Sequence, residues 1–277
     1  MKSAAARILL KNMDRPIILK IEKIVDENPN VKTFYFSYAL KSQPGQFVML
    51  WIPGTDQKPF SLSSDNGEMF GLTVFKRGPL TEKLFSLPVG GKVGISGPYG
   101  TAFTQKPTTH YIMVAGGYGA APLAFLADKL SPLPQTTVDF LIGARNAENL
   151  LFENRLNATP NVKLHIFTND GSRGEKGLVT DPLPELLKQN INSLVVTCGP
   201  ELMEKKILEI CNEFNVECEV SIERYMKCGM GICGQCAVDP LGICMCTHGP
   251  VVNRELANQI LEFGKYHRDK TGNIISF

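Results

Sequence analysis

The sequence lacks the features that mark membrane, nucleic-acid-binding and fibrous proteins. No apolar run approaches the length of a membrane span, so we expect no membrane association. The formal net charge is only +2, which gives no reason to expect nucleic acid as a partner. We find no internal repeat and no low-complexity segment. With 43% hydrophobic and 20% charged residues, the composition is typical of a soluble globular protein.

Histidine is scarce, and nothing in the sequence supports hydrolytic chemistry. None of the four histidines has a recognisable nucleophile or metal partner in the sequence. They are His110, His165, His248 and His267. Cys246-Thr247-His248 has the form of half a Rieske site, but the second half is missing. We therefore interpret His248 as a turn residue.

A secretory signal and a disulfide framework are also missing. The early apolar run at 8–10 is stopped by Lys11 and is too short for a signal peptide. Cys198, Cys211 and Cys218 are scattered through apolar stretches, unlike the cysteines of a small secreted protein. We expect a cytoplasmic protein that begins with a short basic leader.

The first hundred residues have the pattern of a small antiparallel barrel, because short strands follow one another with frequent turns. The predicted strands lie at 18–24, 31–36, 44–51, 69–75 and 92–95, with one short helix at 80–87.

From about His110 apolar strands alternate with amphipathic helices, which predicts a doubly wound parallel sheet of about five strands. The strands are predicted at 111–115, 138–142, 163–167, 194–198 and 217–222, and the helices at 120–130, 147–155, 182–189 and 201–214. The last segment has one predicted helix, at 253–266, and is too small to bury a core of its own. The chain is thus divided into a barrel domain (14–108), an α/β domain (109–222) and a C-terminal module (223–277).

The C-terminal module has cysteines at the spacing of an iron–sulfur site. Cys228, Cys233 and Cys236 follow the pattern C-x4-C-x2-C, which is typical of plant-type [2Fe–2S] proteins. The glycines between them allow a tight curl of the backbone. A structural zinc site and incidental buried cysteines are the alternatives, but zinc knuckles usually have two C-x2-C pairs. We predict a [2Fe–2S] cluster, whose fourth ligand the spacing alone does not decide between Cys244 and Cys246.

A glycine-rich turn opens the first helix of the α/β domain. Gly116, Gly117 and Gly119, followed by Pro122, connect an apolar strand to that helix. Glycines at this place let the backbone approach a pyrophosphate at the helix N-terminus. A tight turn with purely steric glycines is the alternative. The position after the first strand of the sheet favours a nucleotide site.

Two segments of the barrel domain also have the composition of a diphosphate site. The segment from Lys58 to Ser61 by itself is equally typical of a proline in an edge strand. The segment from Lys76 to Thr81 places two cations, backbone amides and a hydroxyl at the start of a short helix, an arrangement that suits a diphosphate.

Together these segments resemble the ferredoxin reductase superfamily over essentially the whole chain after about Asp14. Lys58 to Ser61 is similar to the R-P-x-S flavin motif, with lysine in place of arginine, so the charge is kept but the bidentate fork is lost. The resemblance implies an FAD site made of Lys58, Pro59, Phe60, Ser61, Thr73, Val74, Phe75, Gly78, Leu80 and Thr81.

The same resemblance implies an NAD site in the α/β domain. Gly116 to Pro122 is similar to the family's G-G-x-G-x-x-P loop, and Cys198-Gly199-Pro200 is similar to its C-G-P motif, whose cysteine lies by the nicotinamide ring. Asp170 belongs to a segment similar to T-D-D-G-S and suits ribose hydroxyls, whereas Arg173 would suit a 2′-phosphate. We favour NAD over NADP. The implied NAD site consists of Gly116, Gly117, Gly119, Pro122, Asp170, Gly199 and Pro200, with Cys198 as the catalytic residue.

The cysteine module resembles the electron-transfer subunit of two-subunit dihydroorotate dehydrogenases. In that family the fourth ligand precedes a D-G-P-V-F turn. Gly249-Pro250-Val251 match this turn and imply Cys246, while His248 and Val252 depart from it. Cys244 and Cys246, two residues apart on an extended strand, would face the same side. The resemblance implies an FMN-containing catalytic partner in a heterotetramer with two subunits of each kind, and electron flow through the cluster and FAD to NAD+.

Three alternative functions remain at this stage. The chain is also compatible with the diaphorase subunit of a soluble hydrogenase or sulfur reductase. A second alternative is an NAD(P)H:ferredoxin reductase that meets a free carrier. The third, from a different class, is a non-enzymatic module that binds nucleotide and zinc. The cofactor content and the partner that co-purifies discriminate among them.

Overall fold

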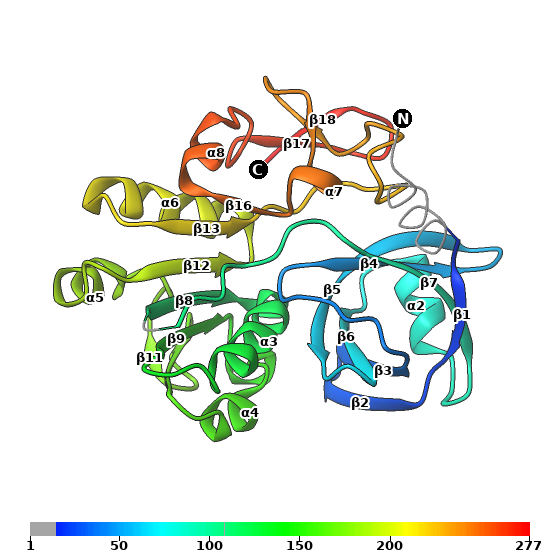
Figure 1. Cartoon of the computed structure of the whole chain (residues 1–277), viewed down its shortest axis with the longest axis horizontal. Coiled ribbons are helices and arrows are strands. Elements are labelled where there is room, and N and C mark those ends of the chain that lie inside the picture. Colours follow the sequence, from blue (N-terminus) through cyan, green and yellow to red (C-terminus); the bar gives the residue numbers. More distant parts are fainter. Residues whose placement is uncertain (1–14, 108) are drawn as a thin grey trace, which may run out of the picture.

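The computed structural model describes residues 15–107 and 109–277, and it contains an antiparallel barrel and a parallel sheet, as predicted (Figure 1). The expected leader falls on residues 1–14, which lie outside the described part of the chain. None of the described helices is both long and apolar enough to cross a lipid bilayer.

The barrel is a seven-stranded sheet with the order β1-β7-β4-β5-β6-β3-β2. Its elements are β1 (Ile17–Lys20), β2 (Lys23–Asn28), β3 (Val31–Ser37), β4 (Phe47–Ile52), β5 (Asp56–Asp65), β6 (Met69–Phe75), helix α2 (Pro79–Phe85) and β7 (Lys92–Tyr99). The strand predicted at 18–24 is two strands, because the chain changes partner between them. The Ile21 N–H donates to Gly91 beside β7 (2.8 Å), whereas the Glu22 N–H donates to Tyr35 in β3 (2.9 Å).

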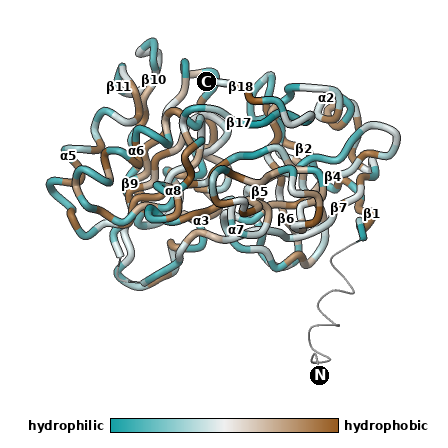
Figure 2. The backbone as a smooth tube through the Cα atoms, turned by 90° about the horizontal axis from the view of Figure 1, so that it is seen from above, coloured by the Kyte–Doolittle hydropathy of each residue, from teal (hydrophilic) through white to brown (hydrophobic). Residues whose placement is uncertain are grey.

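The barrel core is filled by the alternate residues of its strands. Phe34, Leu50, Leu62 and Leu72 are completely buried, and Leu84 of α2 joins them. In Figure 2 the hydrophobic stretches run along the strands and α3. This burial of apolar side chains, at about 25 cal/mol per Å², is the main force that holds the barrel closed.

The second sheet has the order β11-β10-β9-β8-β12-β13-β16. Its elements are β8 (His110–Gly116), η1 (Gly117–Gly119), α3 (Ala120–Leu130), β9 (Thr137–Ala144), η2 (Ala147–Asn149), α4 (Glu153–Ala158), β10 (Val162–Thr168), β11 (Glu175–Lys176), α5 (Leu183–Gln189), β12 (Leu194–Cys198), α6 (Glu201–Phe214) and β13 (Cys218–Ser221). Strands β8 to β13 pair in parallel, while β16 is antiparallel to β13. The parallel core has the predicted strands, and the sheet gains one more at each edge.

Helix α3 joins the two sheets. Its Phe125 is buried in the barrel core rather than in the core of its own sheet. Arg155 of α4 donates to the Ser63 carbonyl of β5 at 2.8 Å. Apolar packing and a charge-assisted hydrogen bond therefore hold the barrel against the parallel sheet.

Two predicted helices are much shorter in the structure. The helix predicted at 147–155 is broken, because Phe152 has a left-handed φ of 62° and stands before a separate α4. The helix predicted at 253–266 is only α8 (Arg254–Gln259). It ends there because the Leu261 N–H donates to the Asp239 carbonyl (3.0 Å) and not to a helical carbonyl.

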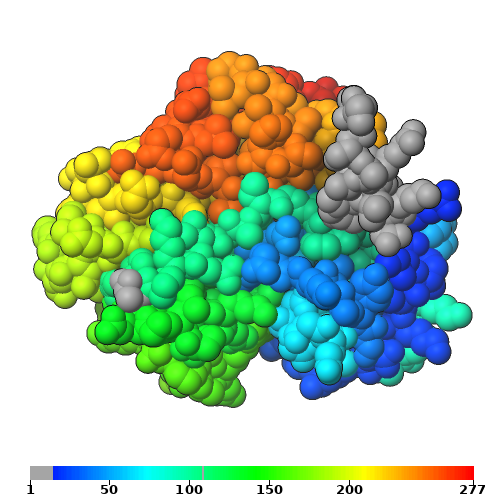
Figure 3. Space-filling view, viewed as in Figure 1, coloured from blue at the N-terminus to red at the C-terminus, as the bar shows by residue number. Residues whose placement is uncertain are grey.

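The C-terminal segment lies across both the barrel and the parallel sheet, as the orange and red residues of Figures 1 and 3 show. Its further elements are β14 (Ala237–Val238), β15 (Ile243–Cys244), α7 (Met245–His248), β16 (Val251–Asn253), β17 (Tyr266–Arg268) and β18 (Ile274–Ser276). Because β16 is an edge strand of the parallel sheet, this segment shares that sheet's backbone hydrogen bonds. The hydroxyl of Thr101, just after β7, donates to the Val251 carbonyl at 2.6 Å.

Candidate functional site

The cysteine loop, residues 228–236, is held in shape by backbone N–H groups that point at sulfur atoms. The Cys233 N–H donates to Cys228 Sγ (3.5 Å), the Gly231 N–H to Cys246 Sγ (3.1 Å) and the Cys246 N–H to Cys236 Sγ (3.4 Å). Each of the four predicted ligands takes part in at least one of these three contacts. Such N–H donors stabilise thiolates, the form of cysteine that binds iron.

The chemistry of the loop favours a thiolate at Cys228 in particular. Partial burial raises the pKa of the Cys228 thiol, but the N–H groups of Cys233, Met230 and Ile232 outweigh it and lower the pKa to about 7. Among the described residues, no group of three His, Cys, Asp or Glu could hold a single metal ion. A two-iron cluster divides four thiolates between its irons, and the donor set of this loop fits that group.

The two candidates for the fourth ligand lie in different elements. Cys244 is the last residue of β15, whereas Cys246 lies in α7 and is buried. The prediction that both stand on one extended strand is therefore wrong, because the chain turns into a helix at Met245. Of the two, Cys246 is the one that accepts the N–H of Gly231 from the cysteine loop.

The cysteine loop packs directly on the barrel beside the predicted flavin motif. Gly229 has a φ of 76°, and a Cβ there would lie 2.8 Å from Met49 Cγ and 3.1 Å from Tyr99. Met49 of β4 is paired with Pro59 of β5. Glycine at 229 is therefore required both for the backbone conformation and for this close approach.

Lys58 of the flavin motif already has two partners. Its Nζ lies 2.7 Å from the hydroxyl of Tyr225, 3.1 Å from a carboxylate oxygen of Asp56 and 4.2 Å from the centre of the Tyr225 ring. Burial works against the charge, but these two partners raise the pKa of Lys58 above its usual value. The cation of the flavin motif thus also contacts the segment that leads into the cysteine loop.

Some of the other predicted flavin-site residues are buried or hydrogen-bonded within the protein, and others are exposed. Val74 belongs to the barrel core, and the hydroxyl of Thr73 is hydrogen-bonded to Thr33 at 2.8 Å. The Thr81 hydroxyl accepts the N–H groups of Arg77 (2.9 Å) and Gly78 (3.0 Å), which fixes the turn before α2. Leu80 is buried with the core as well. The remaining residues of the set, Pro59, Phe60, Ser61 and Phe75, are partly or fully exposed.

The glycine loop after β8 packs against the Cys198-Gly199-Pro200 turn. A Cβ at Gly119 would lie 2.2 Å from the Cys198 carbonyl oxygen, and one at Gly116 would lie 2.6 Å from Pro200. Gly117 differs, because its φ is 54° and nothing lies within 4 Å of the place of a Cβ. Two of the glycines therefore serve loop-to-loop packing, and Gly117 leaves open space for a ligand. Pro122 is buried in the first turn of α3.

Cys198 ends β12 among polar and acidic neighbours. Burial, and to a lesser degree the nearby Glu204, raise the pKa of the Cys198 thiol, while a hydrogen bond with Ser221 works the other way. Glu204 is only 1% exposed and accepts the Gly199 N–H at 3.1 Å. Burial raises the pKa of Glu204 well above its usual value. Sequence reasoning missed Glu204, although its spacing of three, four and seven residues from Ile207, Leu208 and Cys211 places it on the apolar face of α6.

Asp170 and Arg173, which bear on the choice of nucleotide, are both on the surface. Asp170 accepts the Ser172 N–H (2.9 Å) and hydroxyl (2.6 Å), so the turn after β10 is fixed. These bonds lower the pKa of Asp170, which stays ionised. Arg173 pairs with Glu153 of α4. Its charge is thus neutralised locally.

Sequence reasoning also missed an aromatic pair. The Tyr118 ring, from the glycine loop, stacks on Phe75 at the end of β6 with 5.8 Å between centroids and 16° between planes. Arg77 lies near the Tyr118 hydroxyl. The signal was present, since a tyrosine inside a glycine-rich turn has no role in forming the turn.

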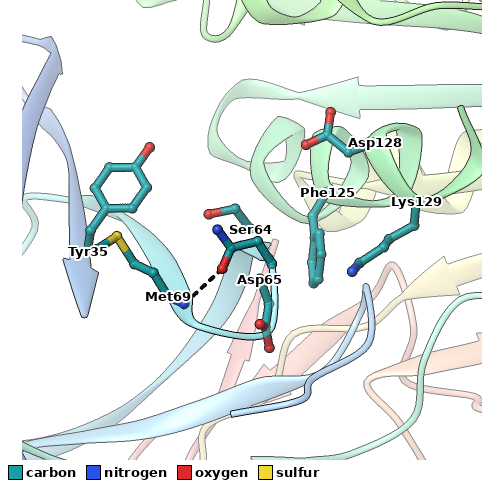
Figure 4. A pocket seen from close by; sticks show the side chains of 8 residues that line it. Tyr35, Ser64, Asp65, Met69, Phe125, Asp128 and Lys129 are labelled. Atoms are coloured by element: carbon teal, nitrogen blue, oxygen red, sulfur yellow. Dashed lines mark hydrogen bonds between the residues drawn. The ribbon is translucent and has the colours of Figure 1, made fainter. Parts of the chain in front are cut away.

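Two surface pockets contain none of the predicted site residues. One, of about 280 Å³, lies between the barrel and α3 (Figure 4) and is lined by Tyr35, Ser64, Asp65, Asn66, Met69, Phe125, Asp128 and Lys129. The other lies beside His110 and the loop 189–193. Neither is associated with the cysteine loop or the glycine loop.

The fold is shared with reductases of known structure. An NADH-dependent reduced ferredoxin-NADP oxidoreductase superposes with a TM-score of 0.78 at 24% identity, covering 89% of this chain and 94% of that chain. The cytochrome b5 reductase domain of Ulva prolifera nitrate reductase gives 0.63 at 17% identity, covering 74% and 95%. The chain thus has the ferredoxin-reductase-like fold, with an added C-terminal cysteine segment.

Sequence comparisons narrow this class. Residues 223–256 match the iron-sulfur cluster binding domain of dihydroorotate dehydrogenase B, and residues 113–209 match the oxidoreductase NAD-binding domain. A probable dihydroorotate dehydrogenase B (NAD(+)), electron transfer subunit, from Methanocaldococcus jannaschii is 44% identical and covers 96% of this chain and 100% of its own length. The Pyrococcus furiosus relative is 41% identical, with 92% and 97% covered. The chain belongs to this family of electron transfer subunits.

Proposed function

We propose that the chain is the electron-transfer subunit of an NAD-linked dihydroorotate dehydrogenase, which couples dihydroorotate oxidation by a partner subunit to the reduction of NAD+ in pyrimidine biosynthesis. The observation that carries the proposal is the packing of the cysteine loop on the barrel. Gly229 touches Met49, whose strand partner is Pro59 of the flavin motif. A cluster site and a flavin site that are neighbours in this way suit electron transfer between them.

The chain's own residues would hold three groups. Cys228, Cys233, Cys236 and Cys246 would bind a [2Fe–2S] cluster, and β5 with the turn before α2 would bind FAD. A bound flavin supplies the exchange between hydride and single-electron chemistry. Around the flavin, the protein's buried side chains would hold the bound groups in position and exclude water.

The nucleotide side of the proposal uses the two packed loops of the parallel sheet. Gly117 leaves room for a pyrophosphate, and Cys198, which packs beside the glycine loop, would contact the nicotinamide. The ionised Asp170 suits ribose hydroxyls and would repel a 2′-phosphate, while Arg173 is paired with Glu153. The proposed nucleotide is therefore NAD.

The proposed partner is an FMN-containing catalytic subunit in a heterotetramer with two subunits of each kind. This chain is similar over nearly its whole length to electron transfer subunits, whose names imply a separate catalytic subunit. A cytoplasmic location is part of the proposal, because all eight cysteines are free and thiolate ligands suit a reducing compartment.

The test is the cofactor content and the redox response of the purified chain. We expect about one FAD and one [2Fe–2S] cluster per chain, bleaching of the flavin by NADH, and FMN in the complex isolated from the native source. A colourless protein would exclude a redox role. If NADPH bleached the flavin at least about tenfold better than NADH, the proposed role of Asp170 would be wrong.

A lysine variant tests the flavin site itself. Lys58→Ala should weaken FAD retention, because a charge-assisted contact contributes about 1.5–3 kcal/mol, and should leave the cluster spectrum unchanged. Tyr225→Phe separates the two roles of Lys58, since it removes the hydroxyl contact and keeps the cation. Lys92→Ala, on an exposed site of β7, is the control. Unchanged FAD occupancy in Lys58→Ala after dialysis would assign the diphosphate to Arg77 and the turn before α2.

A further inference from the structure

Tyr118 occupies a place in the glycine loop that turn geometry does not explain. The residue before it, Gly117, is open to its surroundings, and the residue after it, Gly119, is pressed against the Cys198 carbonyl. The backbone of Tyr118 is thus fixed next to Cys198, the residue proposed to contact the nicotinamide. Its side chain leaves the loop toward the barrel and meets Phe75.

The aromatic pair of Tyr118 and Phe75 is not part of a hydrophobic core. Tyr118 is 45% exposed and Phe75 is 37% exposed, so each ring keeps a large surface open. Phe75 ends β6, in the set of residues proposed to hold the flavin. The pair therefore presents planar apolar surface between the flavin side and the nucleotide side of the proposed site.

Charged groups from two further segments lie near the Tyr118 hydroxyl. They are Arg77, from the turn before α2, and Glu223, at the start of the cysteine segment. The Glu223 carboxylate and burial raise the pKa of Tyr118 to about 12, so the hydroxyl stays protonated at neutral pH. The stack on Phe75 orients the half-exposed Tyr118 ring.

We propose that Tyr118 is a positioning residue for the nicotinamide ring of the bound dinucleotide, which it would contact with its exposed aromatic face. The inference rests on the proposed function and deepens it. A planar heteroaromatic ring is the ligand chemistry that suits such a face, because stacked rings attract beyond their buried area. Phe75 and Arg77 hold the tyrosine in place and need not touch the nucleotide.

The experiment compares two probes on the FAD-loaded holoprotein by equilibrium titration. NAD+ carries the nicotinamide ring, and ADP-ribose is the same molecule without it. In Tyr118→Leu the Kd of NAD+ should rise roughly three- to tenfold, whereas the Kd of ADP-ribose should stay within about twofold. Tyr118→Phe keeps the ring, so it should retain most of the affinity for NAD+.

Controls separate this role from a merely structural one. Tyr38→Leu removes a tyrosine of similar exposure elsewhere on the barrel and should change neither Kd. An equal loss of affinity for both probes in Tyr118→Leu would mean that Tyr118 only shapes the loop, and no loss for either would refute the inference. If Tyr118→Leu were poorly folded, Phe75→Leu should show the same selective loss for NAD+, to a smaller extent, and an unselective loss would overturn the proposal. Failure of the proposed function is distinct, because the parent protein would then bind neither probe.

Discussion

Glu204 is a buried acidic residue that supports the turn after Cys198. Its carboxyl group is almost completely out of water and its hydrogen-bond donor is the N–H of Gly199, in the turn that follows Cys198. An ionised carboxylate pays a large desolvation cost at such a place, so the folded protein keeps the proton. The acid thus supports the loop by accepting this hydrogen bond, while burial raises its pKa.

This burial predicts a pH dependence of stability. The pKa of Glu204 is raised above its unfolded value of 4.5, so the unfolded chain releases the proton first. Stability should therefore fall as pH rises from about 4.5 toward the folded pKa. Glu204→Gln should lessen this fall, and thermal midpoints at pH 5 and pH 8 measure it. We expect a difference of at least roughly 2–4 °C.

The control for this prediction is Glu209→Gln, which changes an exposed acid of the same helix, α6. Its midpoints should follow those of the parent protein at both pH values. If Glu204→Gln behaved like Glu209→Gln, the carboxyl of Glu204 would be ionised in the folded state, contrary to the direction given by its burial.

At the residue scale, the sequence predicts the types of side chains at the site better than their partners. The cysteine set and the glycines follow from spacing, which is a local property. The contact between Lys58 and Tyr225 does not, because it joins residues on different elements that meet only after folding. The same holds for the stack of Tyr118 on Phe75.

The cysteine loop is the element on which the proposed chemistry depends most. Its curl directs N–H groups at sulfur atoms, and α7 brings Cys246 to the N–H of Gly231. Cys244 ends the neighbouring β15 and pairs through its backbone with Ala237. A strand position of this kind stabilises the hairpin without requiring the thiol.

Serine variants of the two cysteines should therefore differ. Cys246→Ser should lose or strongly perturb the [2Fe–2S] cluster, because a serine oxygen replaces a thiolate that the loop is built to accept. Cys244→Ser should leave the iron content and the visible spectrum near normal. Iron analysis and absorbance spectra of the two purified proteins give the measurement, and iron loss in Cys244→Ser alone would reverse the assignment.

Elements with a strong periodic pattern are predicted well, and those shaped by distant contacts are not. Helices α3 and α6 have the predicted bounds, since α3 is apolar over most of its length and α6 has apolar residues at helical spacing. The predicted helix at 253–266 fails because Ile260 and Phe263 both enter the core from a turn, and Asp239 takes the N–H of Leu261. No local pattern contains that information.

At the scale of the whole molecule, a buried ion network centred on Arg224 joins the α/β domain to the C-terminal segment. Its guanidinium donates to Glu201 of α6 and to Glu262 of the C-terminal segment, at 2.6 Å each. Glu262 also accepts the Asp239 N–H (3.0 Å), and Glu201 accepts the Gly264 N–H (2.8 Å). One cation thus joins the parallel sheet to the segment that carries the cysteines.

Removal of this cation should destabilise the whole protein. Arg224→Ala leaves two buried carboxylates without their cation, which costs about 3–5 kcal/mol, and should also loosen the C-terminal segment. Arg224→Lys keeps the charge but not the fork and should lose less. Arg145→Ala, at an exposed site, is the control. Urea unfolding and cluster retention report the effect, and a parent-like midpoint in Arg224→Ala would show that the network contributes nothing.

The pairing of β16 with β13 also bears on how such a protein arises and can be divided. A chain cut before Glu223 would leave the outer edge of β13 with unpaired N–H and C=O groups, and such an edge promotes aggregation. The cysteine segment, residues 223–277, therefore cannot be removed without exposing a sheet edge, although its sequence looks like an addition to the reductase domains. A reductase that gains or loses it has to remake the border of its nucleotide sheet at the same time.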